Sequence, residues 1–232
     1  SMPCLVITGA SSGIGLATAG VFVESGYEVI NLSRSACDVD GVTNIACDLA
    51  DPNFLPDIEA TLLASIAEDE TLCLVHNAAR LAHDCVAEVS PEELRSVYEI
   101  NLIAPAVLNR MLLPSMSPGS SILYVGSTLG EKAVSGSFSY VTSKHAAIGM
   151  MRAPCQDLAG SGVHTACINP GFTDTEMLRD HIPADVMPEI AQMSAYGRLI
   201  EPSEIARTLL FAAQTPVING SVMNANLGQI ER

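Results

Sequence analysis

Short apolar, β-branched runs alternate with longer stretches of helical period along almost the whole chain, and this alternation constrains the fold most. The runs that predict strands are 4–9, 28–33, 43–48, 71–77, 121–127, 164–170 and 221–226. The stretches that predict helices are 14–25, 53–68, 92–113, 138–159 and 203–214. Strands that alternate with helices are typical of βαβ units, in which the strands are parallel. The sequence therefore predicts an α/β fold with a parallel sheet of about seven strands.

The chain has the length of one α/β domain, at 232 residues. No internal repeat or low-complexity linker divides it, so residues 1–232 are predicted to form a single domain. Only residues 172–200 lack a clear period, and an irregular segment of this length in an α/β protein often covers a site. We therefore expect 172–200 to be a substrate lid.

The charge balance excludes several classes of partner. Acidic residues number 26 against 11 basic ones, which gives a net charge of −15. Nucleic acids and anionic membranes are bound through basic faces, so neither is expected as a partner. Proline and charged residues interrupt every apolar run well before the ~18 residues of a membrane-spanning helix.

The pattern of cysteines and the first apolar run indicate in which cellular compartment the protein is located. The seven cysteines form no C-x-x-C pair, which fits buried thiols better than disulfides or a zinc site, so no metal is expected. The first apolar run has neither a basic region nor a cleavage site before it. We expect a cytoplasmic protein.

The first predicted strand runs into TGASSGIG, in which the glycines follow a G-x-x-x-G-x-G spacing. Glycine allows a tight turn and a close approach to a pyrophosphate, whose charge then meets the N-terminus of the next helix. An ordinary glycine-rich turn is the alternative, but the position between the first strand and a helix favours a dinucleotide site. The residues predicted to contact the cofactor here are Gly9, Ser11, Ser12, Gly13, Ile14 and Gly15.

Ligands of parallel sheets bind at the C-terminal ends of the strands. Ser33 and Arg34 lie at the end of the second strand, where an acidic residue would bind the ribose 2′-hydroxyl of NAD. Because no acid is present and an arginine can pair with a 2′-phosphate, the sequence predicts NADP, with NAD as the second choice. An arginine that only faces solvent is the alternative. Small or polar residues at the next strand ends are predicted to flank the adenosine: Asp48, Leu49, Asn77 and Ala78.

Tyr140 and Lys144 lie four residues apart in a predicted helix, so their side chains share one face. An ammonium group beside a phenol favours the phenolate, which prepares the tyrosine for proton transfer. The same lysine can hold ribose hydroxyls through its three N–H donors. Such pairs arise by chance on many helices. The order of the glycine turn, Asn101, Ser127 and this pair along the chain argues against chance.

At this point the chain resembles the short-chain dehydrogenase/reductase family over essentially its full length, through TGASSGIG, HNAA, EINL, VGS, YVTSK and NPGFTDT. The resemblance implies a Rossmann-like, doubly wound parallel sheet with helices on both faces. It implies a catalytic tetrad in which Tyr140 transfers the proton, Ser127 steadies the substrate oxygen and Lys144 tunes Tyr140. Asn101, the fourth member, would hold a water that relays protons towards Lys144.

The resemblance also implies further cofactor contacts. The residues it places around the nicotinamide and its ribose are Tyr140, Lys144, Pro170, Gly171 and Thr173. The stretches 196–213 and 218–228 are most similar to the 3-oxoacyl-carrier-protein-reductase-like branch, whose members reduce many different carbonyls.

The chain departs from the family pattern at two places. The family has N-N-A-G where this chain has HNAA; Ala79 adds a methyl group there, and His76 is predicted to be structural. Pro154 lies inside the helix of Tyr140, where it removes a hydrogen bond to the carbonyl of Met150 and predicts a kink.

The motifs together predict an NADP-dependent oxidoreductase that interconverts a carbonyl and an alcohol by hydride transfer, with a tyrosine as general acid/base. A non-catalytic dinucleotide-binding sensor is the alternative, and an epimerase or dehydratase, whose family members carry a longer C-terminal domain, is the third. Apolar, methionine-rich residues in the lid favour an apolar small-molecule substrate. Surplus apolar residues on the helices 92–113 and 138–159, together with the resemblance, predict a homodimer or homotetramer.

Overall fold

A computed structural model describes residues 2–68 and 70–230 of the chain. Seven strands form one parallel sheet in the order β3-β2-β1-β4-β5-β6-β7. The strands are β1 (Cys4–Thr8), β2 (Glu28–Ser33), β3 (Val42–Ala46), β4 (Leu72–His76), β5 (Ser121–Val125), β6 (His164–Pro170) and β7 (Ser221–Ala225). The chain first builds outward from β1 to β3 and then returns to continue from β4 to β7. The doubly wound sheet is therefore confirmed, with its switch point between β1 and β4.

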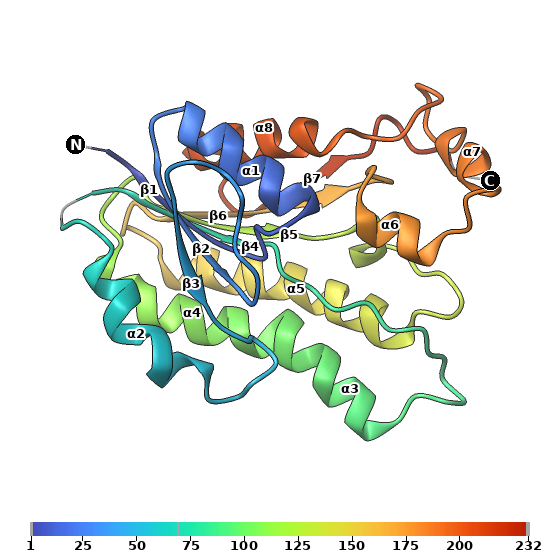
Figure 1. Ribbon diagram of the computed structural model, residues 1–232, viewed down its shortest axis with the longest axis horizontal. Coiled ribbons are helices and arrows are strands. Elements are labelled where there is room, and N and C mark those ends of the chain that lie inside the picture. Colours follow the sequence, from blue (N-terminus) through green and yellow to red (C-terminus); the bar gives the residue numbers. More distant parts are fainter. Residues whose placement is uncertain (1, 69, 231–232) are drawn as a thin grey trace.

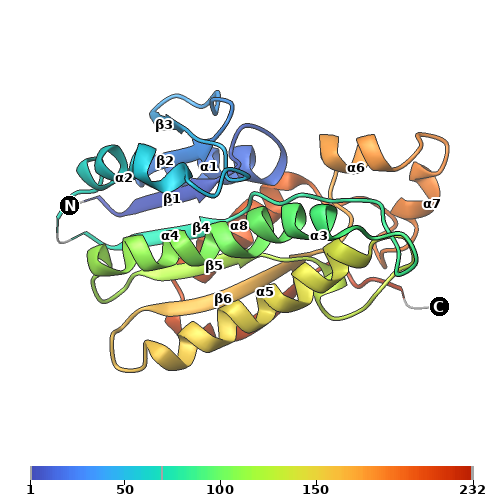
Figure 2. The ribbon, with the colours of Figure 1, turned by 90° about the horizontal axis from the view of Figure 1, so that it is seen from below.

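Helices cover both faces of this sheet, as expected (Figure 1). On one face α1 (Gly13–Glu24) packs against α8 (Pro202–Ala213). On the other face lie α2 (Phe54–Ala64), α4 (Ala104–Leu112) and α5 (Phe138–Asp157), which Figure 2 shows side by side. The short helices α6 (Glu176–His181) and α7 (Met187–Ala191) lie within the predicted lid, beyond the sheet (Figure 1).

The central strands are apolar because both of their faces are covered. Every residue of β1, β4 and β5 is buried. Strands buried on both faces have continuous apolar runs rather than alternating ones. The edge strand β3 buries only Ile45. No helix in the described part of the chain is long and apolar enough to cross a membrane.

The predicted helix 92–113 is interrupted in the structure. It consists of α3 (Pro91–Tyr98), a π-helical turn (Glu99–Ile103) and α4. Ser90 caps α3 by accepting a hydrogen bond from the backbone N–H of Glu93. The π turn contains the buried Asn101, and such turns often mark functional sites.

Candidate active site

A cavity of about 930 Å³ opens at the C-terminal ends of the central strands. Ligand sites span roughly 300–1,000 Å³, so this volume is large enough for a dinucleotide together with a small substrate. Every residue predicted to contact the cofactor lines it, with the exception of Gly15. Of the predicted tetrad, Ser127, Tyr140 and Lys144 line the cavity and Asn101 does not.

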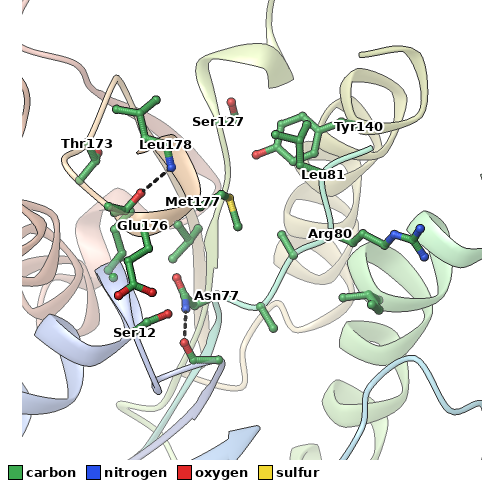
Figure 3. A pocket seen from close by; sticks show the side chains of 18 of the residues that line it. Ser12, Asn77, Arg80, Leu81, Ser127, Tyr140, Thr173, Glu176, Met177 and Leu178 are labelled. Atoms are coloured by element: carbon green, nitrogen blue, oxygen red, sulfur yellow. Dashed lines mark hydrogen bonds between the residues drawn. The ribbon is translucent and has the colours of Figure 1, made fainter. Parts of the chain in front are cut away.

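The glycine turn between β1 and α1 is shaped by its neighbours. Gly9 and Gly13 have φ angles of 69° and 57°, which side chains other than glycine rarely adopt. A Cβ at Gly15 would lie 2.3 Å from the carbonyl oxygen of Gly9 and 2.5 Å from Nδ2 of Asn77. The same Nδ2 donates to that carbonyl at 3.0 Å (Figure 3). Gly15 therefore serves the site by leaving room behind the turn.

Two polar residues that the sequence analysis missed hold this end of the site together. The hydroxyl oxygen of Thr8 accepts hydrogen bonds from the backbone N–H groups of Asn77 and Ala78, both at 3.0 Å. Oδ1 of Asn31 accepts from the N–H of Ala10 at 3.0 Å. The signal available for Asn31 was a polar residue between the apolar residues VI and L in the middle of the run EVINLS.

The cavity wall at the C-terminal end of β2 consists of Ser33, Arg34 and Ser35. Arg34 is exposed and makes no ion pair with any residue the structure describes. Its guanidinium is thus available to an anionic group in the cavity.

The hydroxyl groups of Ser127 and Tyr140 project into the same space at the other end of the cavity (Figure 3). Oγ of Ser127 accepts a hydrogen bond from the N–H of Leu129 at 3.0 Å, which leaves the hydroxyl proton free to be donated. Nζ of Lys144 lies 5.3 Å from the centre of the Tyr140 ring. It is buried and donates to the carbonyl of Val125 at 3.1 Å, so a positive charge is held beside the phenol.

Asn101 lies behind the wall and joins two segments. Its Oδ1 accepts from the N–H of Arg80 at 2.8 Å, while Nδ2 donates to the carbonyl of Arg80 at 3.1 Å and to Oγ of Ser143 at 3.0 Å. Both N–H groups of the side chain are therefore used. A relay water at this residue would have to bind its backbone carbonyl or the remaining lone pair of Oδ1.

The loop after β4 is fixed by contacts that the sequence analysis did not foresee. The Arg80 side chain points away from the cavity (Figure 3), pairs with Glu93 at 2.9 Å and also contacts Ser96. The buried Asp84 accepts a hydrogen bond from the N–H of Ser139 at 3.0 Å. The N-cap residue of α5, Ser137, makes no capping hydrogen bond with its side chain. Asp84 supplies the cap instead, directly before Tyr140.

The predicted lid closes one side of the cavity. Thr175 caps α6 by accepting from the N–H of Leu178 at 3.2 Å (Figure 3). Its methyl carbon would lie 3.4 Å from a Cβ at Gly13, so the start of α6 rests on the glycine turn. Glu176 extends towards Ser12 (Figure 3). Thr175 was also missed, although the spacing of TEML is that of a helix cap.

His76 is a structural residue in this arrangement, as predicted. It does not line the cavity, and burial lowers its pKa to about 4. A neutral imidazole remains, whose Nε2 donates to Oδ1 of Asn109 at 2.7 Å. No cluster of three or more metal-binding side chains occurs among residues 2–68 and 70–230.

Comparison with known proteins identifies the family. The family model described as short chain dehydrogenase matches residues 3–185. The chain is 29% identical over 236 residues to the 3-oxoacyl-[acyl-carrier-protein] reductase FabG of Vibrio cholerae. The matched region covers 96% of this chain and 95% of that protein. It is 30% identical over 222 residues to the cis-4-hydroxycyclohexanecarboxylate dehydrogenase of Sinomonas cyclohexanicum, covering 90% and 88%.

Among solved structures, the ligand-free aldohexose dehydrogenase of Thermoplasma acidophilum matches with a TM-score of 0.90 at 25% identity, over 98% of this chain and 93% of that one. The same family is indicated by the order of the strands, by the residues that line the cavity and by the family model. The chain therefore belongs to the short chain dehydrogenase family, whose members are NAD(P)-dependent oxidoreductases that act on small carbonyl and alcohol compounds.

Proposed function

We propose that this protein is an NADP-dependent oxidoreductase that interconverts a carbonyl and an alcohol, with Tyr140 as general acid/base. The observation that carries the proposal is the convergence of Ser127 and Tyr140 at one end of a cavity whose other end is the glycine turn. Lys144 is held beside Tyr140, so the arrangement contains a proton donor, an oxygen-binding hydroxyl and a compensating charge.

When bound, NADPH would supply the hydride for carbonyl reduction, and NADP⁺ would accept it in the reverse direction. In the direction of reduction, the Ser127 hydroxyl donates a hydrogen bond to the carbonyl oxygen, and Tyr140 then transfers its proton to that oxygen. The nearby Lys144 ammonium stabilises the phenolate that remains. General acid catalysis of this kind contributes typically ~10²–10⁴-fold to the rate.

We infer an apolar carbonyl compound as the substrate. The apolar residues that line the cavity include Leu81, Leu129, Phe172 and Met177, and Leu81 lies beside the tyrosine ring (Figure 3). Such a wall removes apolar surface from water, and a methionine adapts to different shapes. The similarity of the C-terminal stretches to the 3-oxoacyl-reductase-like branch supports a 3-oxoacyl or related ketone, with residues 172–200 as the lid.

The cofactor assignment rests on Arg34. Arg34→Ala should weaken the binding of NADPH far more than that of NADH, because only NADPH carries the 2′-phosphate. Dissociation constants of both cofactors for the parent and the variant measure this. Equal losses for the two cofactors, or a parent that prefers NADH, would show that the assignment is wrong.

The reaction itself is tested with the parent protein. A panel of ketones, β-ketoesters and alcohols is assayed with each cofactor, and we expect turnover of apolar carbonyl compounds with NADPH. Tight NADPH binding without turnover of any member would support a non-catalytic sensor instead.

A further inference from the structure

Two histidines from distant segments meet on the cavity wall, outside the predicted tetrad and the cofactor contacts. His83 lies on the loop after β4 and is exposed, and His181 is the last residue of α6 and is half-buried. Their ring centres are 5.0 Å apart and their planes are inclined by 44°. The loop after β4 is tied to the body of the protein through Asp84, so this contact joins α6 to a fixed element.

The hydrogen bonding leaves ring nitrogens free for a ligand. Nδ1 of His181 lies 2.7 Å from the carbonyl oxygen of Met177, and a carbonyl can only accept, so Nδ1 carries the proton and Nε2 keeps its lone pair. Histidines that bind metals usually donate their other N–H group in this way. His83 makes no hydrogen bond or ion pair with any residue described, so both of its nitrogens are available.

The separation of the rings fits two ligands of one ion. A zinc–nitrogen bond is about 2.0–2.1 Å, and a ring centre lies roughly 1.2 Å beyond the bonded nitrogen, so each centre is about 3.2 Å from the metal. At a tetrahedral angle, two such rings have centres about 5 Å apart. The observed separation of 5.0 Å between the ring centres matches this value.

The overall charge of the protein favours cations over anions as ligands. Neither histidine forms an ion pair with a carboxylate in the described part of the chain, and the net charge of the protein is −15. An acidic protein raises the local concentration of cations. With two protein ligands, the other positions of the ion are left to water, so binding is weaker and more easily reversed than at a four-ligand structural site.

We propose that His83 and His181 bind a zinc ion that links α6 to the loop after β4 and holds the lid closed. Because α6 also rests on Gly13 through Thr175, an ion at this point restrains the wall past which cofactor and substrate exchange. Zinc then acts as a reversible inhibitor. The inhibition rests on the proposed function, whereas the binding site does not.

Calorimetric titration of the purified protein with Zn²⁺ alone tests the site. We expect one ion per chain, and His83→Asn and His181→Gln should each weaken binding at least ~10-fold, since even loss of an outer-shell partner costs a metal site about 10–100-fold. His145→Gln is the matched control, because His145 has the same contact with a carbonyl of its own helix at 2.9 Å but no second imidazole beside it. Cys85→Ser controls for a nearby half-buried thiol.

The proposal is overturned if the parent binds no zinc, if the two variants bind it as tightly as His145→Gln, or if Cys85→Ser abolishes binding.

A second experiment measures the rate of carbonyl reduction with and without Zn²⁺, and each variant is compared with its own metal-free rate. Inhibition that a chelator reverses, and that both histidine substitutions abolish, supports the closed lid. Zinc binding without inhibition would overturn the proposal that the ion holds the lid closed. A parent without activity would count against the proposed function, while the titration still decides the zinc site.

Discussion

Gly15 shows how one residue supports the cofactor site without lining it. The space that a side chain would need is occupied by the carbonyl oxygen of Gly9 and by Nδ2 of Asn77, which donates a hydrogen bond to that oxygen. Any side chain at this position must therefore displace the backbone of the turn that we propose approaches the pyrophosphate. Gly20 lies on the same helix, and a Cβ added there would meet nothing within 4 Å, so the two glycines form a matched pair.

We predict that Gly15→Ala lowers the free energy of unfolding by about 1–3 kcal/mol, as overpacking does, and weakens NADPH binding. Gly20→Ala should raise the free energy of unfolding by about 0.5–1 kcal/mol, because alanine is the better helix former where space is open. Urea unfolding and cofactor titration of both variants check this. Normal NADPH affinity in Gly15→Ala would contradict the assigned role of this residue.

The helix α5 reveals how the protein accommodates a proline. Pro154 has no N–H group, so the carbonyl of Met150 loses its helical partner. The Tyr124 hydroxyl from β5 donates to that carbonyl at 3.3 Å and accepts from Nδ2 of Asn109 at 2.8 Å. Since His76 donates to the same Asn109, one partly buried chain of hydrogen bonds runs from His76 to the Met150 carbonyl that Pro154 leaves without its helical donor.

Tyr124→Phe should lower the free energy of unfolding by about 1–3 kcal/mol, because it leaves the Met150 carbonyl and the Asn109 amide unsatisfied. In a Pro154→Ala background the loss should be smaller, since an alanine at this position supplies the missing N–H group to the Met150 carbonyl. A double-mutant cycle by urea unfolding measures the coupling. Additive effects of the two substitutions would show that Tyr124 does not compensate for the proline.

The order of elements in the whole molecule could be predicted because each covered strand is an apolar run and each strand ends in a recognisable group of residues. The sequence also located the residues of the cavity wall, since the C-terminal ends of parallel strands meet at one edge. It did not reveal the cap of α5 by Asp84 or the meeting of His83 with His181. These contacts join residues far apart in the chain and have no local pattern. The π turn around Asn101 was missed because its residues continue the helical period.

We propose that the whole molecule assembles through α4 and α5, which lie on one open face (Figure 2). Leu108, Leu112 and Met151 are buried in the chain's own core and do not contribute to the apolar surplus predicted there. The exposed part of α5 includes Ala146 and Gly149, whose small size allows a second helix to approach closely.

Gly149→Arg should therefore shift the protein from an oligomer to the 24.3 kDa monomer, since a Cβ added there meets nothing within 4 Å in its own chain and the arginine would extend into the proposed interface. Light scattering measures the mass. Ala60→Arg on the exposed face of α2 is the control and should leave the mass unchanged. A parent that is already monomeric at micromolar concentration would refute the assembly.

The central claim is that Tyr140 transfers the proton in a carbonyl reductase, and Tyr140→Phe tests it most directly. The substitution removes one hydroxyl group and keeps the ring beside Lys144. The measurement is turnover of the best carbonyl substrate with NADPH, together with the NADPH dissociation constant of the same preparation. We predict that turnover falls by at least ~10²-fold while NADPH affinity stays within a few-fold of the parent. Turnover within a few-fold of the parent would contradict the account.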